Sequence, residues 1–338
     1  MTNQIVSVQT NPNPASAGIV LRQFDVVNAD GTISRPFAEI DVKTSGGRDK
    51  YNALQFSLTR RVQRGLTLNG HYTFAKSEGN SAGSNEAVTA GNNAVAIPAF
   101  DYDHGYNRFD VRHTFNVSAL WNMPIGKDRK LNLGPLNAIF SNMDMGLILN
   151  GRSGIPIDVL VTRTDIAYVD GTGAVFSTAA AGRTAVINTP GGGASRNTRR
   201  PNVVPGVDPY LTNGLQWLNP AAFSIPAPGQ FGNLKRGDIR GPSIRQIDLV
   251  TIKRLSTGGR AGIDLRFEVF NLLNRNNYAN PSGTLANALG TGTNQIQPGQ
   301  AFTQAAAGST FGLLRSTVGT TVGLGTNRQI QFAARVSF

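Results

Sequence analysis

The sequence predicts an all-β fold, an antiparallel transmembrane β-barrel wall with long extracellular loops and short periplasmic turns. Three observations support this prediction. The strands alternate between apolar and polar residues, tight turns alternate with very long connections, and the chain ends on a strand with one apolar face. Side chains two residues apart lie on the same face of a strand, so the printed sequence shows which residues share a face.

The first clear hairpin joins "YNALQFSLTRRV" to "LTLNGHYTFAKS". Leu54, Phe56 and Leu58 share one face of the first strand, and Tyr72 and Phe74 share one face of the second. Only the turn "QRG" separates the two segments, which is typical of a β-hairpin. Both strands are longer than the roughly 5 or 6 residues that are usual in globular proteins. Their length favours strands that span a membrane.

The same alternation recurs in "RFDVRHTFNVSALWN", "AGIDLRFEVF" and the closing "RQIQFAARVSF". The segment "RQIDLVTIKRL" alternates less cleanly, because Ile247 and Leu249 take one parity while Val250 and Ile252 take the other. We also expect strands near residues 37–45 and in "MDMGLILNGRSGIPIDVLV", which gives about eight strands in total.

The connections between these strands differ greatly in length. "QRG" and "STGGR" are tight, "MPIGKDRKLNLGPLNAIFSN" is moderate, and residues 78–107, 162–242 and the stretch before the last strand are long. If the chain ends on the periplasmic side, nearly every long connection is extracellular, as in transmembrane β-barrels. Loops longer than about 15 residues are uncommon inside a compact soluble domain. A soluble basic β-protein is therefore the less favoured interpretation.

The composition excludes several classes of function. The chain has no cysteine, so disulfides, thiolate zinc sites and thiol nucleophiles are excluded. Its net charge of +12 would suit nucleic acid, but the basic residues are scattered apart from the pairs Arg60–Arg61 and Arg199–Arg200, and we expect no nucleic-acid binding. The first residues lack the pattern of a secretory signal, and no apolar run is long enough for a spanning helix. We therefore expect a fragment whose export signal lies elsewhere.

Several motifs in order resemble one family of membrane proteins. They are "YNALQFSLTRRVQRGLTLNGHYTFAKS", "FDVRHTFNVSALWNMPIG", "NGRSGIPIDV", "RPNVVPG", "WLNPAAFSIPAPGQFGNLKRGDIRGP", "IDLRFEVFNLLNRNNYANP" and "RQIQFAARVSF". From about Phe37 onward the chain is similar to the C-terminal barrel region of TonB-dependent outer-membrane receptors. It is most similar to the Oar-like branch, whose members carry a carboxypeptidase-regulatory-like domain near the N-terminus.

The resemblance implies a location in the cell outer membrane, a 22-stranded barrel with an N-terminal plug, and energy supplied by the inner-membrane TonB complex. We expect residues 1–338 to be a single C-terminal segment of such a barrel, because the plug, the TonB box and the regulatory-like domain have no counterpart here. The expected function is reception or transport of an unknown ligand. The TonB complex would act only through the N-terminal region. A structural or adhesive barrel without transport is the alternative.

Candidate sites for catalysis or metal binding are weak. "DYDHG" offers Asp101, Asp103 and Gly105 as the opening of a calcium loop, but Arg112 stands where a bidentate glutamate is required. A loop that binds a cation loosely is the alternative to a simple solvated loop. The three histidines are not spaced as metal ligands are, and no serine or aspartate lies in a recognisable sequence motif for a catalytic nucleophile. We therefore expect no metal, no cofactor and no enzymatic activity.

The polar parity of the strands should face the barrel lumen, where charged side chains can hydrate, pair with one another or contact a plug. Recognition of a ligand is expected on the loops 78–107 and 162–242, because loops on a rigid scaffold usually carry it. The expected lumen-facing charges are Asp110, Arg112, Arg266, Glu268 and Arg335.

The closing strand offers a further candidate site. Phe338, Val336 and Phe332 occupy alternate positions of one parity, which predicts a strand facing the outer-membrane lipid with a terminal ring at the interface. The family resemblance implies that this terminal pattern is the signal read by the barrel-assembly machinery. An edge strand could pair with that machinery by β-augmentation. A simple interfacial anchor and an ordinary edge strand are the alternatives.

Overall fold

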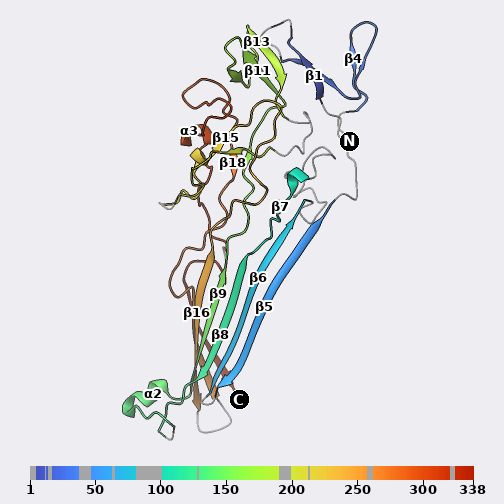
Figure 1. Cartoon of the computed structure of the whole chain (residues 1–338). Coiled ribbons are helices and arrows are strands. Elements are labelled where there is room, and N and C mark those ends of the chain that lie inside the picture. Colours follow the sequence, from blue (N-terminus) through green and yellow to red (C-terminus); the bar gives the residue numbers. More distant parts are fainter. Residues whose placement is uncertain are drawn as a thin grey trace.

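The computed structural model combines a sheet of long strands with a cap of packed loops beyond one end of it (Figure 1). It describes residues 5–11, 13, 17–37, 47–62, 65–80, 101–127, 129–189, 199–211, 214–256, 262–319 and 324–338. The strand expected near residues 37–45 falls almost entirely outside these residues. No helix in the described part of the chain is long and apolar enough to cross a membrane.

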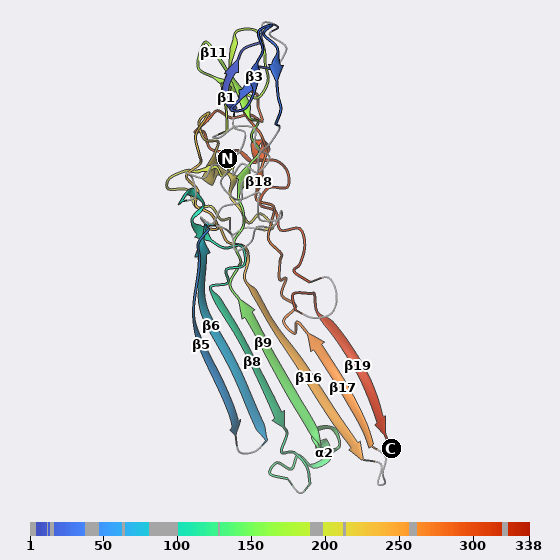
Figure 2. The same cartoon turned by 90° about the vertical axis from the view of Figure 1, so that its right-hand side faces the viewer.

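Seven long antiparallel strands form the main sheet, and the short β7 (Gly105–Tyr106) pairs with β6. Each long strand pairs with the long strands before and after it in the chain, and they form one curved wall (Figure 2). The strands have 9 to 14 residues, enough to span the hydrocarbon core when tilted. In order they are β5 (Asp49–Val62), β6 (Leu66–Gly79), β8 (His113–Asn122), β9 (Met143–Arg152), β16 (Ile244–Ser256), β17 (Gly262–Phe270) and β19 (Gln329–Ser337).

The two ends of the sheet carry connections of different length, as predicted. Residues 63–65, 123–142 and 257–261 connect strands at the end where the chain terminates (Figure 1). Residues 80–112, 153–243 and 271–328 connect them at the opposite end, where the cap lies. Short turns mark the periplasmic end of an outer-membrane barrel and long loops mark the extracellular end. The cap therefore lies at the end that corresponds to the extracellular end of such a barrel.

One face of the sheet is apolar across all seven strands. Directly paired residues lie on the same face, and the register pairs Leu58 with Gly70, Gly70 with Val117 and Val117 with Leu149. This confirms the parity predicted from the alternation. The main apolar residues of this face are Leu54, Phe56, Leu58, Leu66, Leu68, Tyr72, Phe74, Phe115, Val117, Ala119, Trp121, Met145, Leu147, Leu149, Ile247, Leu249, Ile263, Leu265, Phe267, Val269, Ile330, Phe332, Ala334 and Val336.

The register also resolves the strand that alternates less cleanly. Ile247 and Leu249 lie on the apolar face, opposite Leu149 and Leu147. Thr251 lies on this face as well, and its hydroxyl donates to the carbonyl of Phe267 at 3.3 Å, so the polar atom is satisfied within the sheet. Their neighbours on β16 lie on the polar face, where they form an apolar pocket of about 240 Å³. The apolar side chains that line it include Leu120, Ile148, Val250 and Ile252.

Aromatic rings gather on the apolar face of β5, β6 and β8. Tyr72 stacks on Phe56 with ring centroids 6.3 Å apart, and its hydroxyl contacts Nδ1 of His113 at 2.9 Å. Phe74 lies 5.2 Å from the His113 ring. Rings of this kind are enriched where a barrel wall passes from hydrocarbon to the headgroup region. This group of rings lies toward the extracellular end of the wall.

The cap has a hydrophobic core of its own. Phe223 and Phe311 are fully buried at its centre and pack edge to face at 5.9 Å. Arg163 is almost fully buried beside the core and donates to the carbonyls of Asn188, Ala227 and Gln230. The other core members are Ile157, Val159, Val161, Ala167, Val175, Leu218, Ala222, Ile225, Leu234, Ile239, Leu285, Ala288, Leu289, Ile296, Phe302, Ala306 and Ala307.

Short elements of the cap hold this core together. They form a parallel pair, a three-stranded sheet, an antiparallel pair and isolated helical turns. Their bounds are β10 (Leu160–Val161), β11 (Ile166–Asp170), β12 (Val175–Phe176), β13 (Arg183–Ile187), β14 (Asn202–Val203), η3 (Pro220–Ala222), β15 (Phe223–Ser224), β18 (Thr284–Leu285) and α3 (Gln304–Ala307).

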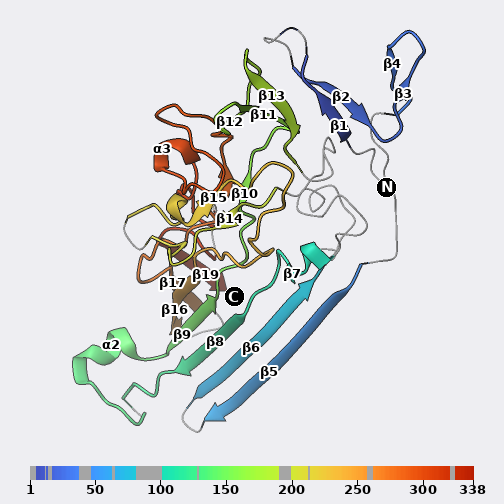
Figure 3. The same cartoon turned by 45° about the horizontal axis from the view of Figure 1, so that its top comes forward.

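Two hairpins before the sheet extend to the outermost part of the molecule (Figure 3). β1 (Ile5–Gln9) pairs with β2 (Ile19–Arg22), and β3 (Val26–Val27) pairs with β4 (Ile33–Ser34). The first hairpin docks on β13 of the cap. Gly18 allows this close approach, because an added Cβ would lie 2.8 Å from Ala185 Cβ. Its amide also donates to the Tyr168 hydroxyl at 3.1 Å.

The face assignment predicts a difference between two neighbouring residues of β8. Val117→Arg places a charge on the lipid face and should lower the free energy of unfolding by about 2–4 kcal/mol near the bilayer midplane, whereas Ser118→Arg should be tolerated. A titration of the refolded protein in lipid vesicles measures both values. Equal losses in the two variants would contradict the orientation of the sheet.

Candidate functional site at the junction of sheet and cap

A buried carboxylate lies where the sheet meets the cap. Asp110 precedes β8 in a turn closed by the hydrogen bond from its amide to the Asn107 carbonyl, 2.8 Å long. Its side chain is fully buried. One carboxylate oxygen accepts the backbone N–H of Ser77 at 2.5 Å, and the other pairs with Arg240. The strand predicted from residue 108 therefore begins only at His113, because Asp110 turns toward the cap.

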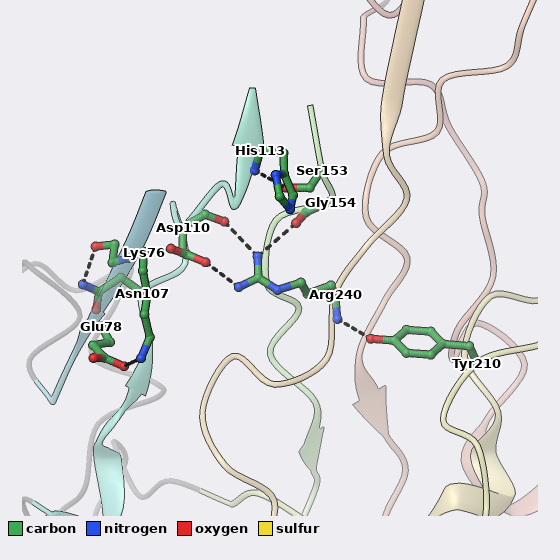
Figure 4. Close-up of polar contacts among 10 residues, drawn as sticks. Lys76, Glu78, Asn107, Asp110, His113, Ser153, Gly154, Tyr210 and Arg240 are labelled. Carbon is green, nitrogen blue, oxygen red and sulfur yellow. Dashed lines mark hydrogen bonds and ion pairs between the residues drawn. The ribbon is translucent and has the colours of Figure 1, made fainter. Parts of the chain in front are cut away.

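Arg240 links three segments of the chain (Figure 4). Beyond its ion pair with Asp110, its guanidinium donates to the carbonyls of Asp110 and Gly154 at 3.2 Å each. Its backbone N–H donates to the Tyr210 hydroxyl at 2.8 Å. The indole N–H of Trp217 donates to its carbonyl at 2.9 Å. One residue thus joins the end of the sheet to separate segments of the connection 153–243.

The ring of Tyr106 lies among three cationic side chains. The guanidinium groups of Arg240 and Arg112 lie 4.9 and 5.1 Å from its centroid, and the ammonium of Lys76 lies 5.7 Å away. Lys76 also forms an ion pair with Glu78 on the same strand. A tyrosine face attracts cations. Tyr106 therefore holds positive side chains close together at the extracellular end of the sheet.

A second arginine of the cap reaches the same region. Arg236 is 1% exposed, and it donates to the Gly79 carbonyl at 2.6 Å and to the Asn107 side chain at 3.0 Å. The Asn107 amide in turn donates to the Ser77 hydroxyl at 3.0 Å. Burial lowers the pKa of Arg236 from its ordinary value. We call Ser77, Asn107, Asp110, Arg236 and Arg240 the junction cluster.

A buried ion pair lies in the cap beside the junction cluster. Arg200 contacts Asp103 at 3.0 Å, and both side chains are at most 2% exposed. The guanidinium also donates to the carbonyls of Tyr102 and Leu234 and lies 3.9 Å from the centroid of the Tyr102 ring. Burial raises the pKa of Asp103 to about 6, against the opposing effect of Arg200.

The other side of the sheet has its own junction with the cap. Asn271 directly follows β17, has a positive φ of 52° and is fully buried. Its amide donates to Asp248 at 2.8 Å, and its side chain donates to the carbonyls of Arg275 and Thr326. Gln246 donates to the same Asp248 carboxylate at 2.8 Å. The strand predicted in "AGIDLRFEVF" ends at Phe270, directly before this residue.

These contacts fix the cap rigidly on the wall. Every side chain described at the two junctions forms a hydrogen bond across or beside the boundary between wall and cap. The arrangement therefore serves to position the loops of the cap. No group of three histidine, aspartate or glutamate side chains among the described residues could hold a metal ion. Asp103, considered above for a calcium loop, is instead paired with Arg200. The residues of loop 78–107 from 81 to 100 lie outside the described residues.

The chain matches the model of one protein family, described as outer membrane beta barrel domain, over residues 2–331. The chain belongs to this family. The spanning strands, the apolar outer face and the unequal connections of this outer membrane β-barrel domain agree with that assignment. Curated proteins include no match to the chain, and solved structures include none either.

The structure of this outer membrane β-barrel domain separates the five charges expected to face the lumen. Arg266 and Glu268 lie on the polar face of β17 and pair with each other at 2.7 Å. Arg335 lies on the polar face of β19, opposite Asp264. Asp110 is buried at the junction, and Arg112 lies just before β8, between the rings of Tyr106 and Phe74. Of the five, Asp110 therefore belongs to the junction cluster, and Arg112 contacts the Tyr106 ring beside it.

A row of alternating charges crosses the polar face near its periplasmic end. Asp144 of β9 pairs with Arg254 of β16, which lies opposite Asp264 of β17. Asp264 lies opposite Arg335 of β19. The Asp144 carboxylate also accepts the side chain of Asn122 at 2.6 Å. This face is consistent with a wetted lumen wall on which charges compensate each other.

The closing strand places its three candidate residues as the alternation predicts. Phe332 and Val336 lie on the apolar face of β19, opposite Phe267 and Ile263, and both are highly exposed. Phe338 follows the last strand residue, and its side chain is wholly exposed at the periplasmic end of the wall. These positions suit contact with lipid. The outer edge of β19 has no neighbouring strand in the described sheet.

The sequence analysis did not assign a role to Arg200, Arg236 or Arg240. All three lie in motifs that carried the family resemblance, "RPNVVPG" and "GNLKRGDIRGP", and the pair Arg199–Arg200 stood out as a local concentration of charge. Their partners among residues 79–110 are 97 to 157 residues away in the chain, so no local pattern points to these contacts. Charged residues are rare in these glycine-rich and proline-rich loops. That rarity is the one sequence feature that could have indicated that these arginines have buried partners.

Breaking the junction pair should loosen the cap. In Asp110→Asn the guanidinium of Arg240 stays half-buried without its counter-charge, and the free energy of unfolding of the cap should fall by about 3 kcal/mol. Trp217 reports on the cap, because its indole donates to Arg240, and a Trp121→Phe background removes the signal of the other tryptophan. Urea titration of the refolded protein, followed by fluorescence, measures this change.

Glu268→Gln is the matched control for this prediction. It breaks a pair on the polar face whose arginine is 48% exposed, and such a pair contributes at most about 1 kcal/mol. If both variants shifted the transition equally, Asp110 would have no special part in holding the cap.

Proposed function

We propose that this chain forms part of the wall and the ligand-recognising cap of a TonB-dependent outer-membrane receptor whose ligand is unknown. The observation that carries the proposal is the cap. Loops 153–243 and 271–328 pack around a common core of buried apolar residues and are fixed to the wall at two buried junctions. A preorganised loop assembly of this size suits recognition, because loops held by a rigid scaffold bind without a large ordering cost.

The open sheet gives further support. β5 and β19 are the edges of the described sheet, and each pairs on one side only. An open edge cannot persist in hydrocarbon, because its backbone N–H and C=O groups would have no partner. Each edge must therefore pair in the membrane with the other edge or with further strands, and we propose that further strands complete the wall. Together with the motif resemblance, this favours a barrel of larger strand number, with TonB acting through an N-terminal region outside this chain.

A structural or adhesive barrel without transport is the second candidate. The outermost hairpins favour it, because Val26, Val27 and Phe37 are all more than half exposed there. Exposed apolar side chains at the distal end of a surface protein suit contact with another surface. The same wall and cap would serve this function.

A deletion strain of the producing organism separates the two functions. Growth is measured on a panel of nutrients, each at limiting concentration, in cells with the intact gene, with the gene deleted, and with the Asp110→Asn or Glu268→Gln variant. A receptor predicts that uptake of one nutrient falls to the level of the deletion strain with Asp110→Asn and stays normal with Glu268→Gln. That uptake should also stop when a protonophore removes the energy that TonB needs.

The opposite result would support the structural or adhesive function. In that case the deletion leaves uptake of every nutrient unchanged and alters attachment of cells to surfaces or to one another.

We further propose that β19 and Phe338 are read by the barrel-assembly machinery. The strand presents a free edge and an apolar face with alternate side chains Ile330, Phe332, Ala334 and Val336. Such an edge can pair with an exposed strand of another barrel through its backbone, while the alternate side chains give specificity. Phe338 makes no contact that would stabilise the folded wall, since its side chain is wholly exposed.

Deleting Phe338 should therefore impair insertion in cells far more than it lowers stability. The comparison uses the intact gene with its export signal, and it measures the amount inserted in the outer membrane beside the unfolding midpoint after refolding in detergent. Leu324→Ala, which removes an exposed apolar side chain away from β19, is the matched control. If insertion falls only as far as stability does, Phe338 is an interfacial anchor and the proposed signal is wrong.

A further inference from the structure

The connection between β8 and β9 is unusual for the periplasmic end of the wall. The two other connections at that end span residues 63–65 and 257–261, whereas this one spans 123–142. It contains the turn η2 (Gly134–Leu136) followed by α2 (Asn137–Phe140). Figures 1 and 3 show this segment projecting from the end of the sheet. A longer connection at the short-turn end needs a separate explanation.

Hydrogen bonds within the segment hold it in a defined shape. The amide of Gly126 donates to the Leu131 carbonyl at 2.9 Å, and the amide of Leu131 donates to the Pro124 carbonyl at 3.0 Å. The side chain of Asn137 donates to that of Asn132 at 2.6 Å and accepts the amide of Leu133 at 3.0 Å. Many of its backbone groups are thus already satisfied, which lowers the cost of entering a poorly hydrated environment.

The apolar side chains of this ordered segment point away from the protein. Leu131, Leu133, Leu136 and Ile139 are 47%, 40%, 51% and 59% exposed. Among the described apolar side chains of the segment, only Ile125 at its start is buried. A folded segment gains nothing in water from displaying four large apolar side chains, so their display indicates a surface that covers them.

The position of the segment indicates what covers these side chains. Lys253 lies on the apolar face of β16, opposite Met143, and its ammonium donates to the carbonyl of Ser141 at the end of the segment. The segment is therefore attached to the lipid-facing side of the wall at the level of the strand ends. Its exposed apolar residues continue the established membrane surface into the interfacial region.

The charge of the segment fits the same surface. Lys127, Arg129 and Lys130 precede the apolar residues and are exposed. Asp128 is the single acidic residue between them in the sequence. Basic residues beside apolar ones are typical of segments that lie in the plane of an anionic membrane surface.

We propose that residues 124–142 form an interfacial anchor that inserts Leu131, Leu133, Leu136 and Ile139 among anionic phospholipids of the periplasmic leaflet. Lys127 and Lys130 contact the phosphate groups while the four apolar side chains enter the upper acyl region. The anchor fixes the depth of the wall in the membrane at β8 and β9, next to the strands that carry the junction with the cap.

A single environment-sensitive label tests this anchor. The chain has no cysteine, so Ile139→Cys gives a unique thiol for an NBD label. The full chain is reconstituted into vesicles of phosphatidylethanolamine and phosphatidylglycerol, a fraction of which is brominated near the top of the acyl chains. The anchor predicts blue-shifted emission and strong quenching. Phe332→Cys on the lipid face provides the positive control, and Ala181→Cys in the cap provides the solvent control.

The lipid charge tests the role of the cations. Quenching at position 139 should increase with the phosphatidylglycerol content, and the double change Lys127→Gln with Lys130→Gln should remove that dependence. If the label at position 139 stays solvent-exposed like the label at 181 while the label at 332 is quenched, the anchor is wrong. The anchor is also wrong if the emission at 139 is blue-shifted but brominated lipid does not quench it, because a protein would then cover the label. Equal quenching in phosphatidylcholine vesicles would overturn the recognition of anionic headgroups.

Discussion

The pairing of backbone groups in hydrocarbon is the constraint on which the rest of this structure depends. Between the two edges of the sheet, each long strand is bonded to both of its neighbours, so the wall leaves few polar groups facing lipid. Once pairing fixes the register, the two-residue period of the strands decides which side chains meet lipid and which meet water. The apolar side chains from Leu54 to Val336 form one face for that reason, and even Thr251 on this face returns its hydroxyl to the sheet.

The cap follows the opposite rule. It lies in water, so its apolar residues are enclosed around Phe223 and Phe311, and buried polar residues such as Arg163 and Arg200 are hydrogen-bonded within it. Where cap and wall meet, neither lipid nor water can satisfy buried charges, and the two parts supply partners to each other through Arg240 with Asp110 and Asn271 with Asp248. Buried polar groups therefore lie at the boundary between the two kinds of packing as well as within the cap, where Asp103 pairs with Arg200.

Much of the wall could be predicted from the sequence because alternation is a local signal. Leu58, Val117 and Phe332 lie on the face that their parity predicted, and the connections have the expected asymmetry. The start of β8 could not be predicted, because a turn at Asn107–Asp110 interrupts a segment whose alternation continues. The core of the cap could not be predicted either, because its short segments are distant in the chain and share no hydrophobic periodicity.

The ion pair at the junction also depends on the pairing of the central strands. Asp110 and Arg240 are separated by 130 residues and stand directly before β8 and β16, so their contact closes a long loop. Closure of a long loop carries an entropic cost that is recovered only when both ends are held. Pairing of β8, β9 and β16 brings both residues to the same end of the wall. The entropic cost of the ion pair is therefore smallest in a wall whose central strands are already in register.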